Sequence, residues 1–367
     1  MNSDWTTCKI GDICKKICSG GTPKSNEPSY YGGNIPWLNT KEINFNRIYN
    51  TEKYITSSGL NNSSAKWIDA NSVIVAMYGA TAAKVSINTI PLTTNQACCN
   101  LTIDETIADY RYVYYYLCRN YQHLALLANG GAQQNLNAQQ IKDFNIILPQ
   151  LPIQHKIANI LWTIDDKIEL NRRINDNLEE QAKVLYNQIL NSGYVGSQHN
   201  LGEFIDICSG KSIKPGREGL YPILGANGEI GRTNDFLFDG RFIYTGRVGT
   251  LGKICRVEDE KVWMSDNTLV IKPRIGYNFI YFALKNMNLH SYNVGSTQPL
   301  IRQSDMKGIK ISLPNHTILQ DFEQVCDSLF RQINKNNKQN MILSSLRDTL
   351  LPKLMSGELS IEEVSFD

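Results

Sequence analysis

Apolar residues recur at helical spacing in two long segments of this chain, residues 148–190 and 313–355. With Ile157 and Phe322 taken as heptad position a, positions a and d form two seams with asparagine at their centres. The seam residues are Ile157, Leu161, Ile164, Ile168, Asn171, Asn175, Leu178, Ala182, Leu185 and Ile189, and then Phe322, Cys326, Leu329, Ile333, Asn336, Asn340, Leu343, Arg347, Leu350 and Leu354. This pattern predicts a two-stranded coiled coil. Helices of this length measure roughly 60 Å, more than a globular unit can bury, so each needs the other as its partner.

The two helical segments belong to a larger internal repeat. They align without a gap at an offset of 165 residues (336 − 171), and their asparagine pairs coincide. Shorter segments upstream also match: "DFNIILP" with "GIKISLP", which alternate like strands, "YRYVYYYL" with "YNFIYFAL", "GGAQQNLN" with "VGSTQPLI", "TTNQA" with "SDNTL", and "ICSGG" with "ICSGK". In this alignment Asn135 faces Pro299 and Asn95 faces Asn267. Each copy is therefore a strand-rich globular unit followed by a long helix.

The direction of the two helices follows from the path of the chain. An antiparallel pair is favoured, because a parallel pair would require the second globular unit to carry the chain back along the whole helix. The antiparallel arrangement places Asn171 near Asn340 and Asn175 near Asn336. These amides are either exposed polar residues or a device that fixes the helix register, since slipping them against leucine would leave their hydrogen bonds unmade.

The predicted fold class is α+β with an internal pseudo-two-fold repeat: two strand-rich globular domains separated by two long antiparallel coiled-coil helices. The predicted boundaries are residues 1–149 for the first domain, 150–192 for the central helix, 193–313 for the second domain, 314–356 for the C-terminal helix and 357–367 for a tail.

Composition narrows the class of protein. The apolar share is 42% and the charged share 20%, no apolar run is long enough to span a bilayer, and "MNSDWTTCKI" lacks the features of an export signal, so we expect a cytoplasmic protein without membrane contact. The nine cysteines are scattered and the five histidines lack metal-ligand spacing, so no metal is expected. We also find no P-loop, GxSxG, HExxH or methyl-transfer motif, and expect neither a cofactor nor catalysis.

The distribution of polar side chains is more informative than the net charge of +2. In the second copy, eight loop cations, Arg241 and Arg256 among them, outnumber four acidic residues, and the first copy combines a few lysines with amide-rich segments. Such groups suit phosphates, guanine edges and adenine, although each alone is more typical of a solvated loop. The candidate DNA-contacting residues are Ser19, Gly20, Thr22, Lys24, Lys41, Thr81, Lys84, Asn95, Gln96, Gln133, Gln134 and Asn135, and then Lys211, Lys214, Arg217, Asn227, Arg232, Arg247, Lys253, Asn267, Gln298 and Arg302.

Several of these segments carry a family resemblance. "SGGTPKS" with "YYGGNIPWLNTKEI", "GATAAKV", "GGAQQNLNAQQIKDFNIILPQLPIQHKIANIL", "YTGRVGTLGKI" and "LRDTLLPKLMSGEL" resemble the specificity subunit of type I restriction-modification systems, over nearly the whole chain. The resemblance implies two target-recognition domains, each recognising one half of a bipartite double-stranded DNA target. It further implies helices that dock two methyltransferase subunits, restriction subunits that join this core, and no catalysis by the chain itself.

The second copy departs from the first at two of these segments, and two other classes of protein remain as alternatives. Pro299 removes the amide that Asn135 offers in the first copy, and the change from "TTNQA" to "SDNTL" leaves Gln96 without an equivalent. A different class of protein, a scaffold that presents two protein-binding modules on a coiled-coil spacer, has the same repeat. A stand-alone enzyme is disfavoured by the missing catalytic motifs.

Overall fold

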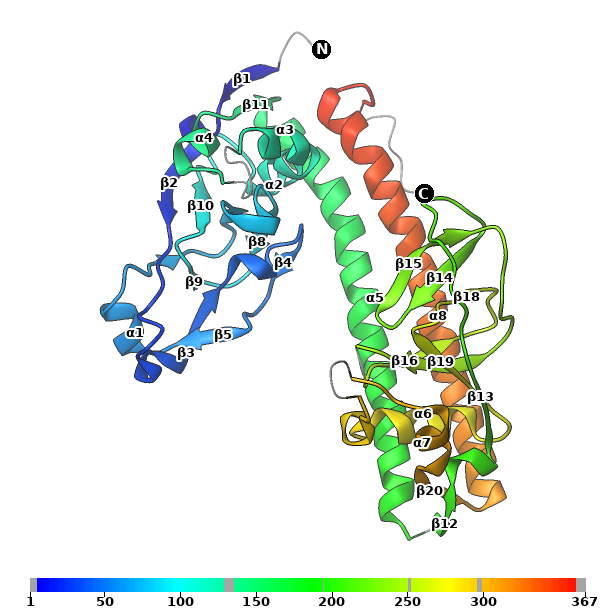
Figure 1. The fold of residues 1–367 in the computed structure, drawn as a ribbon. Coiled ribbons are helices and arrows are strands. Elements are labelled where there is room, and N and C mark those ends of the chain that lie inside the picture. The colour runs from blue at the N-terminus through cyan, green and yellow to red at the C-terminus, as the bar shows by residue number, and fades with distance from the viewer. Residues whose placement is uncertain (1–4, 129–134, 194, 250–251, 296–298, 361–367) are drawn as a thin grey trace. The chain divides into compact units, whose positions relative to one another are not determined.

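The computed structural model describes residues 5–128, 135–193, 195–249, 252–295 and 299–360. They fall into two compact units, which we call the first unit (Met1–Glu169 with Gln339–Asp367) and the second unit (Leu170–Lys338) (Figure 1). Each unit combines one strand-rich part with about half of each long helix. Among the described residues no helix is both long and apolar enough to cross a membrane.

The first unit contains three sheets, in the strand orders β2-β10-β7-β8-β4, β5-β3-β9-β6 and β1-β11. Its strands are β1 (Thr6–Lys9), β2 (Cys14–Ser19), β3 (Tyr31–Leu38), β4 (Arg47–Ile48), β5 (Lys53–Ile55), β6 (Trp67–Ile68), β7 (Val73–Ala76), β8 (Val85–Asn88), β9 (Leu92–Thr94), β10 (Cys98–Ile103) and β11 (Asn145–Leu148). Its short helices are α1 (Ser57–Asn61), α2 (Tyr110–Arg119), α3 (Tyr121–Leu126) and α4 (Ala138–Lys142). The predicted strand of "DFNIILP" is β11, which pairs with β1.

The five-stranded sheet lies between two hydrophobic cores, because alternate residues of a strand point to opposite faces. Val73 and Val75 of β7 pack in the core that contains the aromatic helix α2. Ile74 and Ala76 pack in a second core together with Leu38 of β3. All four side chains of β7 are buried for this reason, and the sheet acts as the rigid centre of the unit.

The second unit repeats this plan with fewer strands, in the orders β13-β19-β16-β17, β15-β14-β18 and β12-β20. Its strands are β12 (Val195–Asn200), β13 (Ile205–Ser209), β14 (Tyr221–Gly225), β15 (Gly228–Thr233), β16 (Phe242–Gly246), β17 (Ile254–Val257), β18 (Trp263–Met264), β19 (Thr268–Pro273) and β20 (Lys310–Pro314). Its short helices are α6 (Tyr277–Lys285) and α7 (Gln303–Gly308). Ile243 of β16 packs with α6 on one face of the sheet, while Phe242 and Tyr244 pack on the other.

The long helices are α5 (Leu151–Asn191) and α8 (His316–Ser356). Inside the first unit, Arg347 Nη1 of α8 donates to Asp165 Oδ1 of α5 at 2.8 Å, and Leu354, further along α8, packs in the core that holds Ile157, which precedes Asp165 on α5. The two helices therefore run antiparallel there, as predicted. Every predicted a and d side chain of the two seams is buried or half-buried.

The second unit shows the same direction, because Asn175 of α5 contacts Asn336 of α8, while Tyr186, further along α5, has its ring centre 6.4 Å from that of Phe322, which precedes Asn336 on α8. Asn336 Nδ2 donates to Asn175 Oδ1 at 2.8 Å, and Asn175 Nδ2 donates to Asn337 Oδ1 at 2.8 Å. The structure thus contains the predicted contact between Asn175 and Asn336. Asn171 and Asn340 belong to different units, so their proximity stays a prediction, as does the role of all four amides in fixing the register.

Candidate nucleic-acid interface

Four of the segments singled out in the sequence meet at one end of the five-stranded sheet in the first unit. There β2 and β7 end and β10, which lies between them, begins. Gly21 N donates to Thr94 O, Met77 N to Ala97 O and Leu136 N to Met77 O, each at 2.8 Å. We call residues 19–22, 77–81, 95–97 and 135–137 the first loop cluster.

The second unit brings the equivalent segments to the equivalent end of its sheet, where β13 and β16 end and β19 begins. Lys211 N donates to Met264 O at 2.9 Å, Arg247 N to Asn267 O at 2.7 Å and Ile301 N to Arg247 O at 3.1 Å. We call residues 209–211, 247–249, 265–267 and 299–303 the second loop cluster. The two clusters share a backbone framework, because the same hydrogen bonds recur in the same order.

The framework corrects two registers of the sequence alignment. In the first loop cluster Cys98 N donates to Asn95 O, and in the second loop cluster the equivalent hydrogen bond runs from Thr268 N to Ser265 O. The counterpart of Asn95 is therefore Ser265 rather than Asn267, and Gln96 corresponds to Asp266. The alignment failed because it matched the shared asparagines, whereas the strands that follow set the true register.

The second correction concerns the segment before the long helix. Tyr78 forms an antiparallel bridge with Asn135, and Val248 forms the same bridge with Leu300. The counterpart of Asn135 is thus Leu300 and not Pro299. The amide of Asn135 still has no equivalent in the second loop cluster.

A glycine follows the serine of each "ICSG" segment because the backbones approach closely there. A Cβ on Gly20 would lie 2.1 Å from Thr94 O, and a Cβ on Gly210 would lie 2.2 Å from Ser265 O. Backbone atoms cannot be displaced cheaply from such a contact. Gly20 therefore shapes the loop cluster, and its presence does not by itself indicate contact with DNA.

The predicted polar residues of the first loop cluster differ in exposure. Gln96 and Asn135 are exposed, and Thr22 donates a hydrogen bond to Gln96 Oε1. Asn95 is buried, and its Oδ1 accepts from Ala97 N at 3.1 Å, so this oxygen is used inside the loop. Ser19 and Thr81 are half-buried within the same cluster. Gln133 and Gln134 lie outside the described residues.

The three predicted lysines of the first unit lie outside the loop cluster as defined. Lys24 is exposed in the segment after β2. Lys41 forms an ion pair with Glu52, whose hydrogen bond and charge raise the pKa of Lys41. Lys84 Nζ donates to Asn44 Oδ1 at 2.7 Å. The first loop cluster itself contains no charged side chain in these ranges and offers hydroxyls and amides only.

The second loop cluster carries three cations, Lys211, Arg247 and Arg302, and one acidic residue, Asp266. Lys211 and Arg302 are exposed, as is Asn267, and Arg247 is half-buried. Lys253 reaches Asn227, whose backbone oxygen accepts from Lys253 Nζ at 3.2 Å. This cluster therefore carries a net positive charge, whereas the first carries neutral polar groups.

The other predicted residues of the second unit lie around the β14–β15 hairpin. Arg232 Nε donates to Gly219 O at 2.9 Å and its Nη2 donates to Leu220 O at 3.1 Å, so its guanidinium holds the preceding loop. Lys214 and Arg217 are exposed in that segment. Gln298 lies outside the described residues.

A sequence model described as "Type I restriction modification DNA specificity domain" matches residues 2–180 and 198–342 of this chain, one loop cluster in each match. The chain belongs to this family. The MjaIX specificity subunit of Methanocaldococcus jannaschii is 28% identical over 415 residues, which cover 98% of this chain and 95% of the relative. The EcoprrI specificity subunit of Escherichia coli is 24% identical over 354 residues, which cover 85% of this chain and 86% of the relative.

A solved structure supports the fold of this specificity-family chain. The crystal structure of the S subunit of a type I restriction-modification system from M. genitalium matches with a TM-score of 0.59 at 20% identity, and the match covers 96% of both chains. This match confirms the predicted fold class, and the family match confirms the resemblance stated from the sequence.

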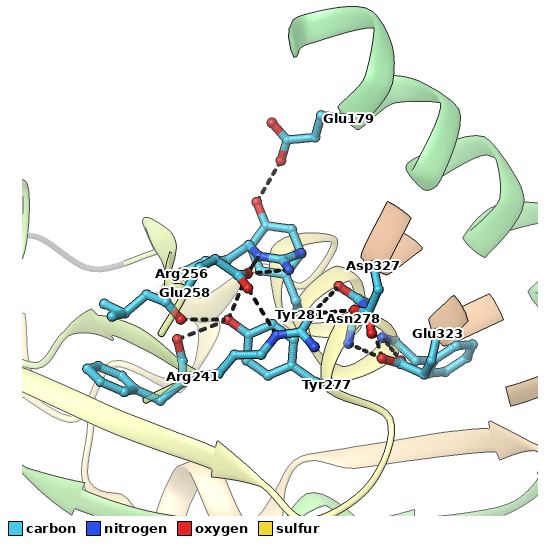
Figure 2. Close-up of polar contacts among 12 residues, drawn as sticks. Glu179, Arg241, Arg256, Glu258, Tyr277, Asn278, Tyr281, Glu323 and Asp327 are labelled. Carbon is cyan, nitrogen blue, oxygen red and sulfur yellow. Dashed lines mark hydrogen bonds and ion pairs between the residues drawn. The ribbon is translucent and has the colours of Figure 1, made fainter. Parts of the chain in front are cut away.

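Two cations of the second unit do not lie at the surface loops where the sequence suggested them. Arg241 and Arg256 were counted among the loop cations, but they pack on the ring of Tyr277, with guanidinium carbons 3.8 and 4.9 Å from its centre. Figure 2 shows both within a polar network that joins α6 to the two long helices. The acidic members of the network on α8, Glu323 and Asp327, are four residues apart in the sequence. This spacing places them on one face of the helix and is the signal by which the sequence could have indicated the network.

Among the residues that the structure describes, no group of three or more metal-binding side chains lies together. The hydrogen bonds of each loop cluster are instead made mostly by the backbone. Several polar side chains are therefore left at the surface of each unit, on a framework that the sheet holds in place.

Proposed function

We propose that this specificity-family chain recognises a bipartite double-stranded DNA target, and that each loop cluster contacts one half of it. The observation that carries the proposal is the recurrence of one backbone framework with different side chains. A common framework places both clusters at the same end of equivalent sheets, and different side chains suit two different half-sites. Binding elements on loops held by a rigid sheet are typical of recognition sites.

The side chains suit the chemistry of DNA. Lys211, Arg247 and Arg302 offer charge to phosphates, and an arginine can bind the O6 and N7 atoms of guanine in the major groove. The amides of Gln96 and Asn135 suit the N6 and N7 atoms of adenine. We therefore expect more phosphate contacts, and a stronger dependence on salt, at the half-site bound by the second unit.

The long helices complete the proposal. Two modules that contact successive major grooves on one face of DNA lie about 34 Å apart, and helices of roughly 60 Å are long enough to hold them. The target would then be two short blocks with a spacer of fixed length and undefined sequence. The helices would dock two methyltransferase subunits, and restriction subunits would join that core, so the chain directs catalysis without performing it.

Selection from random DNA tests this proposal. The chain, purified with its methyltransferase partner, is incubated with a library of randomised duplexes, and the bound fraction is sequenced at several salt concentrations. We expect enrichment of two blocks at one spacing, with affinity that falls as salt rises because phosphate contacts release counterions. A bound fraction without sequence enrichment, or binding indifferent to salt, would instead support a scaffold that binds proteins.

A further inference from the structure

In the second unit the start of helix α6 is capped by a residue of α8. The residue before α6, Gly276, has left-handed backbone angles (φ 59°, ψ 50°) and no side chain to accept a hydrogen bond. Glu323 of α8 takes this role: its Oε2 accepts from Asn278 N at 3.0 Å and its Oε1 from Phe279 N at 2.9 Å. The first amides of a helix need such acceptors, and a negative charge there is favourable.

Asn278 joins this cap to a second carboxylate on the next turn of α8. Its side chain is fully buried, and Nδ2 donates to Glu323 Oε2 at 2.8 Å and to Asp327 Oδ1 at 2.7 Å. Arg241 Nη2 also donates to Asp327 Oδ1, at 2.6 Å. Two turns of α8 therefore bind the start of α6 and the residue that precedes β16, as Figure 2 shows.

The other long helix binds the opposite end of α6. Glu179 Oε1 of α5 accepts from Tyr281 Oη and from Lys285 Nζ, both at 2.6 Å. Tyr281 and Lys285 lie one turn apart on α6, beyond the residues that Glu323 caps. Helix α6 is thus bonded at its start to α8 and towards its end to α5, which opposes both tilting and sliding of the strand-rich part on the helix pair.

Strand β16 connects this network to the second loop cluster. Arg241 immediately precedes Phe242–Gly246 and Arg247 immediately follows it. A strand of five residues spans roughly 17 Å, so a small rotation at Arg241 displaces Arg247. The network therefore controls where the loop cluster stands relative to the helices of its own unit.

The first unit differs at this position. Helix α2 is capped from within its own strand-rich part, because Asp109 Oδ1 accepts from Arg111 N at 2.8 Å. The long helix α5 contributes Gln154, whose Oε1 accepts from Asp109 N at 3.0 Å. Among the described residues, a side chain of a long helix caps α6 in the second unit, whereas α2 in the first unit is capped by Asp109.

We propose that Glu323, with Asp327, is a positioning residue for specificity: it holds the second loop cluster at a fixed orientation on the helices and so limits the spacer lengths that the protein accepts. This inference rests on the proposed recognition of a bipartite target. Glu323 does not contact DNA in this account. Its loss should change the permitted spacing and leave the base sequence of both half-sites as it was.

The test compares methylation of duplexes whose spacers are one base pair shorter, equal to and one base pair longer than the preferred length, with the chain in complex with its methyltransferase partner. In Glu323→Gln the amide nitrogen cannot accept, so at least one of the three hydrogen bonds that the carboxylate accepts is lost. We expect the preference for one spacer over its neighbours to fall about tenfold, as the loss of a hydrogen bond to a charged group allows.

One control and a second test variant make the result decisive. Asp321→Asn removes a charge from the exposed face of the same part of α8 and should leave spacer preference unchanged. Tyr281→Phe removes the bond to Glu179 and supplies a second test if Glu323→Gln proves unstable in thermal unfolding. Folded variants of both residues with wild-type spacer preference would overturn the inference, whereas a wild-type complex that methylates no bipartite target would overturn the proposed function itself.

Discussion

Arg247 is the residue whose position bears most directly on recognition. Its backbone N and O are both used, bonded to Asn267 O and Ile301 N, so the start of its side chain is fixed at the second loop cluster. Arg247→Ala should weaken binding by about 1–3 kcal/mol, the range for loss of a bidentate contact to guanine. The loss should fall on one half-site only, which binding to duplexes altered in either half would measure.

Arg331→Ala is the matched control for this experiment, since Arg331 is exposed on α8 of the same unit. It removes the same charge and should leave the discrimination between half-sites unchanged. An Arg247→Ala variant that lost affinity equally for both halves would contradict the division of labour between the two units.

Gly210 provides a test of the loop framework itself. A Cβ there would meet Ser265 O at 2.2 Å, so Gly210→Ala should lower the free energy of unfolding by about 1–3 kcal/mol through overpacking. Gly308→Ala is the control, because a Cβ at that position meets no atom within 4 Å. Urea unfolding of the two variants measures the difference, and equal stability would show that the loops separate easily.

At this scale the sequence predicted residue types better than residue roles. It identified Arg247 and Lys211, which lie at a loop cluster, but it also counted Arg241 and Arg256, which pack against Tyr277. A cation near a strand looks the same in the sequence whether it faces solvent or a buried ring. The burial of Asn95 escaped prediction for the same reason, since its partners are set by the folded loop.

Among the elements, the aromatic helix α2 depends on a buried carboxylate at its start. Burial tends to raise the pKa of Asp109, but hydrogen bonds from Arg111 and His155 outweigh it and hold the pKa below its ordinary value. A lowered pKa contributes stability that is present at neutral pH and is lost as the pH falls below about 4.

Asp109→Asn should therefore reduce the free energy of unfolding by about 2 kcal/mol at pH 7, because Arg111 and His155 then lose their hydrogen bonds to a charged carboxylate. The difference from the wild type should shrink as the pH falls below about 4. Urea unfolding over this pH range measures it, with Glu105→Gln as a control at a nearby exposed position. A difference that stayed constant with pH would show that the charge of Asp109 contributes nothing.

The amides of Asn175 and Asn336 lie between the long helices and are predicted to fix the register of the pair. Replacing Asn175 and Asn336 together by leucine removes the 2.8 Å contact between them and should leave stability unchanged or raised by about 1 kcal/mol, as for other buried polar groups replaced by apolar ones. The variant should tolerate more than one spacer, because leucine permits more than one helix register. Thermal unfolding together with a spacer series checks both parts, and an unchanged spacer would argue against a register role.

The sequence predicted the long helices better than it predicted the loops. Heptads are local and periodic, so they predicted both long helices. The path of the chain between the helices predicted their antiparallel direction and, with it, the contact of Asn175 with Asn336. The alignment of the loops failed by one or two residues, at Asn135 and Asn95, because hydrogen bonds between distant strands fix that register. The cap of α6 by Glu323 was invisible for the same reason: its partners are 45 and 44 residues away.

For the whole molecule, the internal repeat is the central feature. Two units built on one plan, each ending a sheet in the same set of loops, suit a target that itself has two parts. Their loop clusters differ in charge, so the two parts of the target need not resemble each other. Over the part of the chain that the structure describes, the two long helices contribute to both units, and the spacer between the two parts of the target is therefore expected to be constant.

Mapping methylated bases in the DNA of cells that express this chain with its methyltransferase partner tests this account most directly. The account predicts one motif with two defined blocks, a spacer of a single length between them and a methylated base in each block. A continuous motif without a spacer, or methylation that does not depend on this chain, would contradict it.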